Sequence, residues 1–171
     1  MKKRSKLFSL SVVVVLALGL CPIQAFAGTL TGQSVSFSGN SGFSYRGYTQ
    51  LSYNSNWANG YQYTSCTSTS APIGNVRSLA YVCSSSGQQL AVGNWNVNKS
   101  TLSKGSSISS TANFVQYSGN NVSVYAMGYS SCWRNGGWYD VLSQKTGTAT
   151  VYGGRSADQE SISLTNESSI Y

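Results

Sequence analysis

The chain has 171 residues, a formal net charge of +7, no histidine and only four acidic residues. Without an imidazole the common Ser-His and Cys-His hydrolytic designs are excluded, and so few carboxyl groups give little basis for glycoside hydrolysis or a hard-metal site. We therefore assign the protein no catalytic residue, metal or cofactor, and expect one domain of ordinary size.

Residues 1–27 have the pattern of a secretory signal peptide. Four basic residues within the first seven precede the apolar run 11–20, and Ala25 and Ala27 form an Ala-Phe-Ala cleavage site before Gly28. The run is shorter than the roughly 20 residues of a membrane-spanning helix, and Leu20 before Cys21 does not suit lipoprotein processing. These features predict a secreted, extracellular protein without a membrane anchor.

Charge in the expected mature part is low and dispersed. Removing residues 1–27 from the 171-residue chain leaves 144 residues, and removing four basic residues from the net charge of +7 leaves +3. The remaining basic residues are Arg46, Arg77, Lys99, Lys104, Arg134, Lys145 and Arg155. Because they are scattered singly and form no stripe, nucleic acid is not expected as a partner.

Apolar and polar residues alternate with a period of two along most of the mature chain. The segments with this pattern, in chain order, are 34–37, 43–45, 77–83, 112–117, 122–127 and 148–152. This alternation is typical of half-buried strands, and no segment has a helical period. The predicted fold is all-β over residues 28–153: an antiparallel β-sandwich or small barrel.

Three dipeptides predict tight turns. Asn59-Gly60 and Asn135-Gly136 follow tryptophans, and Gly119-Asn120 precedes the segment 122–127. Asn-Gly accepts the positive φ of a two-residue hairpin. Aromatic residues on both sides of the two Asn-Gly turns predict cross-strand aromatic pairs.

A weak internal repeat relates the two halves. Residues 37–45 parallel 117–125, and 57–61 parallel 133–137. In so biased a composition such similarity also arises by chance, so two similar β-units remain one reading of the sequence.

Three cysteines, Cys66, Cys83 and Cys132, remain after the signal peptide. Export favours disulfides, and three pairings are open; Cys66 and Cys83 could face each other on neighbouring strands. The odd cysteine could link two copies into a dimer. Their spacing fits no zinc site.

The last segment, 154–171, holds Asp158, Glu160 and Glu167, three of the four acidic residues. Only a short alternation interrupts its polar composition. We expect an acidic tail or an edge strand there.

Aromatic and amide residues near the Asn-Gly turns are the candidate binding residues. They are Trp57, Tyr61, Trp133, Arg134, Trp138 and Tyr139. Flat aromatic rings pack against the apolar face of a pyranose while amide and guanidinium groups bond its hydroxyls. About half of the chain's aromatics could instead be core, and similar compositions also make protein-binding surfaces.

The segments 75–81, 86–90, 124–129 and 133–136 resemble those of uncharacterised small secreted β-rich proteins of Gram-positive bacteria. In those proteins an Arg-Leu strand precedes a Ser-Gly turn, and an aromatic-Gly strand precedes a tryptophan hairpin. The resemblance covers roughly residues 75–152 and implies export and β-structure, without implying an activity.

Three functions follow as hypotheses, in this order. The first is a secreted, non-catalytic module that recognises a glycan or cell-wall surface. The second is a structural surface or biofilm protein. The third is a bacteriocin-like antagonist, suggested by export, small size and positive charge, and associated with this chain through architecture alone.

Overall fold

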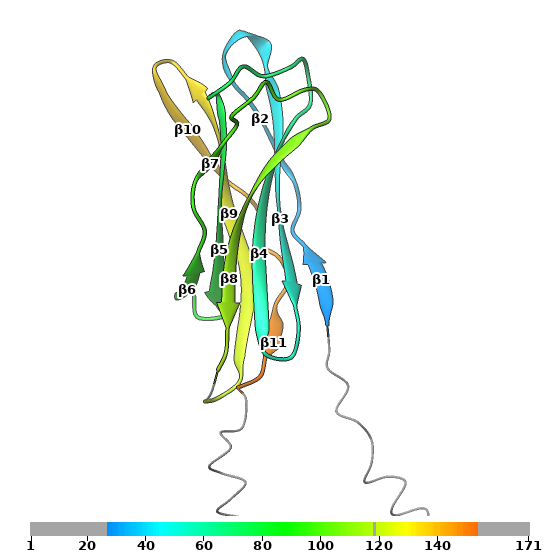
Figure 1. The fold of residues 1–171 in the computed structure, drawn as a ribbon, viewed down its shortest axis with the longest axis vertical. Helices are drawn as coiled ribbons and strands as arrows, with labels where there is room; N and C mark the ends of the chain where they lie inside the picture. Colours follow the sequence, from blue (N-terminus) through cyan, green and yellow to red (C-terminus); the bar gives the residue numbers. More distant parts are fainter. Residues whose placement is uncertain (1–26, 118, 154–171) are drawn as a thin grey trace, which may run out of the picture.

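The computed structural model describes residues 27–117 and 119–153. The predicted signal peptide, up to residue 26, and the predicted acidic tail, 154–171, lie outside these residues. Two antiparallel sheets pack face to face, so the predicted all-β sandwich is confirmed (Figure 1). In the described part of the chain, no helix has the length and apolar character needed to cross a membrane.

The first sheet has four positions across its width. Its strands, in order, are β1 (Gly28–Thr31) and β2 (Val35–Ser38) at one edge, β3 (Ser44–Tyr53), β4 (Trp57–Cys66) and β8 (Ser107–Val115). A short 3-10 turn, η1 (Asn40–Gly42), joins β2 to β3. β3 and β4 are the longest strands of this sheet, and they run from one end of the sandwich to the other.

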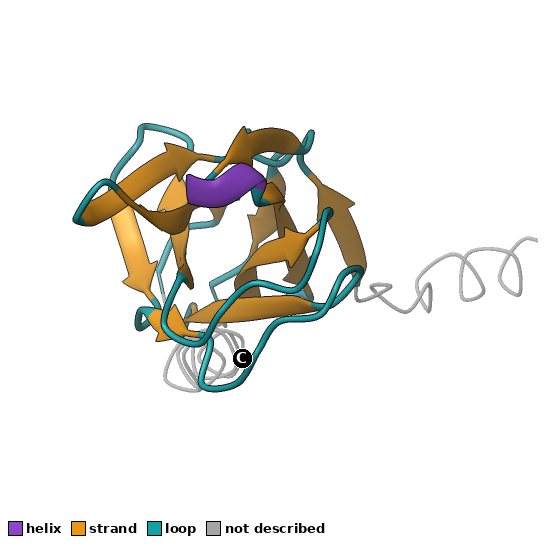
Figure 2. Cartoon of the chain, turned by 90° about the horizontal axis from the view of Figure 1, so that it is seen from above, coloured by secondary structure: helices purple, strands orange, loops and turns teal. Residues whose placement is uncertain are grey.

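The second sheet has the same width. Its strands, in order, are β10 (Gly137–Leu142) and β11 (Ala149–Val151) at one edge, β9 (Val122–Arg134), β5 (Val76–Ser84), and β6 (Gln89–Val92) and β7 (Asn96–Val97) at the other edge. Seen along the long axis, the two sheets enclose one interior (Figure 2). The Asn96 side chain donates to the Ser109 carbonyl at 2.7 Å and joins the sheets along one side.

The prediction of a hairpin at Asn59-Gly60 is wrong. Both residues lie inside β4, paired with β3 and β8, and the turn lies earlier, between Tyr53 and Trp57. Gly60 serves close packing of the sheets: a Cβ there would lie 2.7 Å from the Tyr81 carbonyl oxygen and 3.1 Å from Val82. The two sheets therefore lie so close together at this position that only glycine, which has no side chain, fits.

The hairpin at Asn135-Gly136 is confirmed. Asn135 and Gly136 have φ of 52° and 82°, as a two-residue turn between β9 and β10 requires. The matching segments of the internal repeat, 57–61 and 133–137, therefore differ: the first is a strand and the second a turn. They also lie in different sheets.

Inward-facing residues form two apolar clusters. The cluster at the β2 and β10 end contains Phe37, Tyr45, Cys66, Ala71, Val76, Leu102 and Cys132. The cluster at the other end contains Leu51, Ala58, Ala80, Val82, Ala112, Val124, Ala126, Ala149 and Val151. Alanine and valine dominate the second cluster, which agrees with the close approach of the sheets.

A buried polar layer separates the two clusters. Along each of the four central strands the inward residues change from apolar to polar and back to apolar, as in Val76, Ser78 and Ala80 of β5. The layer consists of Thr49, Gln62, Thr64, Ser78, Ser130 and Ser143, all 4% exposed or less. Such residues are stable in a core only when they are hydrogen-bonded.

Gln62 is the centre of this layer. Its amide nitrogen donates to Ser130 Oγ at 2.8 Å and Ser143 Oγ at 2.6 Å, and its carbonyl oxygen accepts from Thr49 Oγ1 at 2.7 Å. Thr64 Oγ1 is hydrogen-bonded to Ser130 Oγ and to Ser78 Oγ, each at 2.7 Å, and so extends the network to β5. One side chain thus connects β3, β9 and the segment after β10 across the interior.

The three cysteines are free and buried. The suggested pairing of Cys66 with Cys83 is wrong, because β4 and β5 belong to different sheets and Cys83 lies on the outward-facing side of β5. Cys66 and Cys132 lie with Tyr45 in one apolar cluster. Burial, with smaller contributions from Cys132 and Cys66, raises the pKa of Tyr45 to about 12.

Candidate ligand-binding surface

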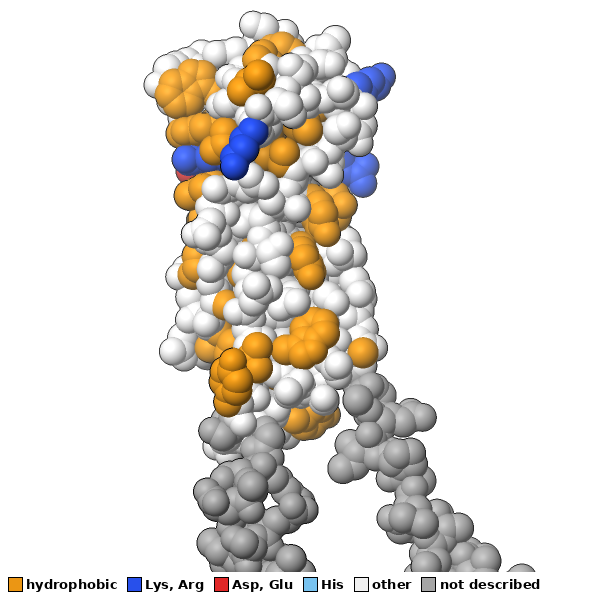
Figure 3. All heavy atoms as spheres, in the orientation of Figure 1, with side chains coloured by type: hydrophobic (Ala, Val, Ile, Leu, Met, Phe, Trp, Pro, Cys, Tyr) orange, Lys and Arg blue, Asp and Glu red, His pale blue; other side chains and the backbone are white. Residues whose placement is uncertain are grey.

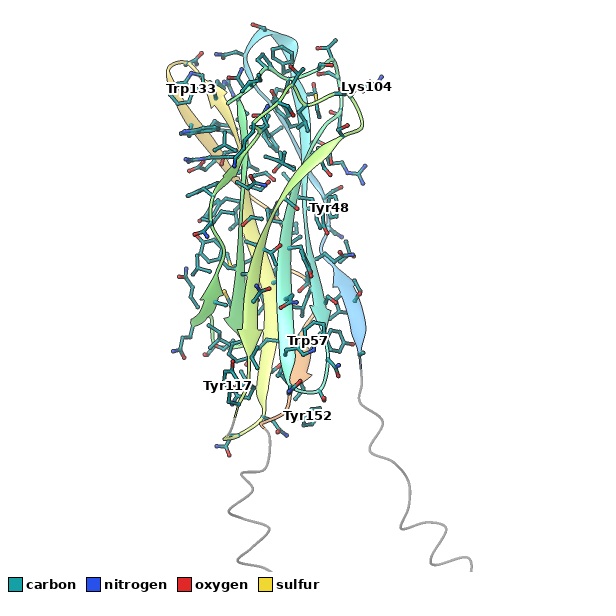
Figure 4. The ribbon with its side chains drawn as sticks, in the orientation of Figure 1. Tyr48, Trp57, Lys104, Tyr117, Trp133 and Tyr152 are labelled. Carbon is teal, nitrogen blue, oxygen red and sulfur yellow. The ribbon has the colours of Figure 1, made fainter. Side chains whose placement is uncertain are left out.

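Two tryptophans form an edge-to-face pair on the outer face of the second sheet. Trp133 of β9 and Trp138 of β10 are directly opposite each other, with ring centroids 5.5 Å apart and planes at 85°. The hairpin at Asn135-Gly136 sets this register, which confirms the cross-strand aromatic pair predicted there. The pairing predicted across Asn59-Gly60 is wrong, because Trp57, Tyr61 and Tyr63 lie on one strand, β4. Trp133 remains 40% exposed at the end of the sandwich (Figure 4).

Arg77 of β5 lies between two tryptophans on the same face. Its guanidinium carbon is 3.8 Å from the ring centre of Trp95 and 4.3 Å from that of Trp138. Its Nη2 donates to Asp140 Oδ1 at 2.9 Å. The contacts of the guanidinium with both indole rings, together with the ion pair, hold these four side chains in a fixed relation.

We call Trp95, Arg77, Trp138, Trp133 and Asp140 the Trp/Arg surface. Ser131 lies between Arg77 and Asp140 in register, and its Oγ and the Nε of Arg77 are buried without a hydrogen-bond partner. The surface combines the exposed indole rings of Trp95 and Trp133 with the ion pair of Arg77 and Asp140. In Figure 3 the blue side chains lie at the β2 and β10 end of the sandwich, with orange side chains beside them, and the opposite end of the molecule shows no blue in this view.

Arg134 and Tyr139 lie on the opposite face of the same hairpin. Tyr139 is paired with Cys132, whose side chain points into the core, so alternation along β10 separates Tyr139 from Trp138. The Arg134 guanidinium lies 5.4 Å from the Tyr139 ring centre. The end of the hairpin bounds an open hollow of about 500 Å³ that both residues line.

Trp57 and Tyr61 lie on the first sheet, whereas the other four candidate residues lie on the second. Both point outward from β4, on the outer face of the first sheet, and Tyr61 continues a row of rings with Tyr63 and Tyr48. The structure thus separates the six candidate residues into three places. It brings Trp133 and Trp138 together, and Arg134 and Tyr139 together.

Arg77, Trp95 and Asp140 were missed by the sequence reasoning. Alternation in segment 77–83 could place Arg77 on one face with Leu79 and Tyr81, but nothing in it pointed to Asp140, which is 63 residues away. Their contact follows from the order β10-β9-β5 in the sheet. The order of strands in a sheet cannot be read from the periodicity of the sequence.

Cys132 does not have the surroundings of an activated thiol. Burial raises its pKa, and the nearby charge of Arg134 lowers it by less. Burial also raises the pKa of the Cys83 thiol. Both are therefore protonated and weakly nucleophilic at neutral pH. Among residues 27–117 and 119–153, no group of three or more Cys, Asp or Glu side chains could hold a metal ion.

The described residues form a two-sheet β-sandwich that carries a partly exposed stack of tryptophan and arginine side chains. The chain matches no family model, and neither a curated protein nor a solved structure is significantly similar to it. The resemblance to small secreted proteins of Gram-positive bacteria stays a prediction.

Proposed function

We propose that the protein is a secreted, non-catalytic module that binds a glycan or cell-wall surface through the Trp/Arg surface. The observation that supports this most is the exposure of two indole rings, Trp95 at 38% and Trp133 at 40%. Trp95 packs on the Arg77 guanidinium, and Trp133 packs on Trp138, the other ring that this guanidinium contacts. Large aromatic side chains that are both exposed and ordered suit ligand binding, because little conformational freedom is lost on association.

The polar groups around the rings suit sugar hydroxyls. Asp140 is 42% exposed while paired with Arg77, and Asn135 lies exposed at the turn next to Trp133. An indole face packs on the C–H side of a pyranose, and neighbouring carboxylate and amide groups bond its hydroxyls. Residues 134–139 line the open hollow at the hairpin end, and Trp138 is the residue that the hollow shares with the Trp/Arg surface. This arrangement favours an extended sugar chain over a compact ligand.

Replacing Trp133 by alanine tests this proposal. We expect Trp133→Ala to reduce the protein's retention on insoluble peptidoglycan or chitin by roughly 30-fold, as for a central aromatic contact worth about 2 kcal/mol. The measurement is a depletion isotherm with purified protein.

Trp57→Ala is the matched control, because Trp57 lies on the outer face of the other sheet. It should retain wild-type binding, and circular dichroism should show both variants folded. Equal retention of Trp133→Ala and wild type on every polymer that the wild type binds would overturn the proposal.

A further inference from the structure

The outer face of the first sheet carries a second hollow, distinct from the Trp/Arg surface. It measures about 380 Å³ and is lined by Arg46 and Tyr48 of β3, the end of β4 from Ser65, and the loop with Lys104 before β8. Figure 4 shows Tyr48 and Lys104 on the side of the sandwich away from Trp133. The hollow and the Trp/Arg surface therefore face different directions.

Two cations border this hollow without a carboxylate partner in the described structure. Arg46 and Lys104 are both exposed. Asp140 is the one acidic residue within 27–117 and 119–153, and it pairs with Arg77 on the other sheet. The positive charge at the hollow is thus uncompensated by any described side chain. An anionic group entering it would gain two favourable charge contacts at once.

Backbone pairing fixes the positions of the two cations. Arg46 is opposite Ser65 in β4, and Ser65 is opposite Ser107 in β8. Lys104 is held close to this row because the Gly105 amide donates to the Cys66 carbonyl at 2.8 Å and the Cys66 amide donates to Ser106 at 3.1 Å. Since adjacent strands are about 4.8 Å apart, Arg46 and the β8 row lie about 10 Å apart at the backbone. Long side chains from both sides can converge on one anion over that span.

A row of tyrosine rings leads away from the hollow. The rings of Tyr48 and Tyr63 are stacked with centroids 4.8 Å apart, and Tyr61 follows at 6.2 Å from Tyr63. Ser109 and Thr111 of the paired strand β8 are opposite Tyr63 and Tyr61. The row offers aromatic edges and hydroxyl groups to further units of a polymer whose anionic group occupies the hollow.

We propose that this hollow binds a carboxylate or phosphate group of an anionic polysaccharide or polyol-phosphate polymer, with Arg46 and Lys104 contacting the anion and Tyr48 the adjoining unit. This site stands independently of the Trp/Arg surface, since it lies on the other sheet and uses charge where the tryptophans use ring stacking. A protein with both sites would bind a wall polymer from two sides.

The test compares three soluble probes by isothermal titration calorimetry at low and at 0.5 M salt. Oligogalacturonate supplies the carboxylate, poly(glycerol phosphate) the phosphate, and chitohexaose the neutral control. The variant Arg46→Gln/Lys104→Gln removes both cations. Lys99→Gln/Lys145→Gln removes the same net charge from exposed residues that do not line the hollow.

We expect Arg46→Gln/Lys104→Gln to weaken binding of at least one anionic probe about tenfold or more, the control variant to bind as wild type, and high salt to weaken the wild type. Loss with one anionic probe alone assigns the site to carboxylate or to phosphate. Equal weakening in both variants, or no wild-type binding of either anionic probe, would overturn the inference. Chitohexaose reports on the Trp/Arg surface alone, so failure of one proposal is distinguished from failure of the other.

Discussion

Gln62→Ala should lower the free energy of unfolding by about 3–5 kcal/mol, the largest effect of any single substitution considered for this fold. The substitution leaves a cavity at a fully buried position and removes a hydrogen-bond partner of Thr49 and of Ser143, and one of the partners of Ser130. Each buried hydroxyl left unpaired carries a desolvation cost. Urea unfolding followed by tryptophan fluorescence measures the change.

Gln89→Ala is the control, because Gln89 is an exposed strand residue in β6 with the same side chain. It should change the free energy of unfolding by less than about 0.5 kcal/mol. A loss for Gln62→Ala no larger than that of the control would show that the polar layer does not stabilise the sandwich.

Gly60→Ala should lower the free energy of unfolding by about 1–3 kcal/mol, although alanine is the better strand residue. The new methyl group would lie 2.7 Å from the Tyr81 carbonyl oxygen and 3.2 Å from the Ala126 methyl group. The two sheets would have to separate locally to accept it. Thermal and urea unfolding both report the change.

Gly137→Ala is the matched control, since a Cβ at Gly137 meets nothing within 4 Å. It should leave stability unchanged or raise it by up to about 1 kcal/mol, through the reduced freedom of the unfolded chain. If Gly60→Ala were as stable as Gly137→Ala, the close approach of the sheets at β4 would be contradicted.

Alternation of apolar and polar residues was sufficient to predict the fold class. Segments 77–83 and 122–127 lie within β5 and β9, the central pair of the second sheet. The period of two arises from the geometry of the strand itself, so it can be recognised without knowing the strand's neighbours. The hairpin at Asn135-Gly136 could also be predicted from local sequence, because Asn-Gly accepts the positive φ of a two-residue turn whatever its neighbours are.

Features that depend on the neighbouring sheet could not be predicted. Asn59-Gly60 has the composition of a turn, but the approach of Tyr81 and Val82 from the other sheet requires a glycine within a strand. The polar layer was missed because Thr49, Gln62 and Ser130 alternate with their neighbours as surface residues do. Only sheet packing shows that these positions face inward.

The candidate site was predicted in part for a similar reason. Trp133 and Trp138 flank a local turn, so their pairing could be foreseen. The stack of Arg77 between Trp95 and Trp138 depends on the order of strands in the second sheet. Trp57 and Tyr61 were grouped with the hairpin by composition, although they occupy the other sheet.

Binding of the purified protein to a glycan and cell-wall array, with tryptophan fluorescence to confirm each hit, tests the central claim most directly. The account predicts a saturable hit that changes tryptophan emission in the wild type and in Trp57→Ala, and that is lost in Trp133→Ala. No hit on the array, or a hit with the same emission change in Trp133→Ala as in the wild type, would contradict glycan binding through the Trp/Arg surface.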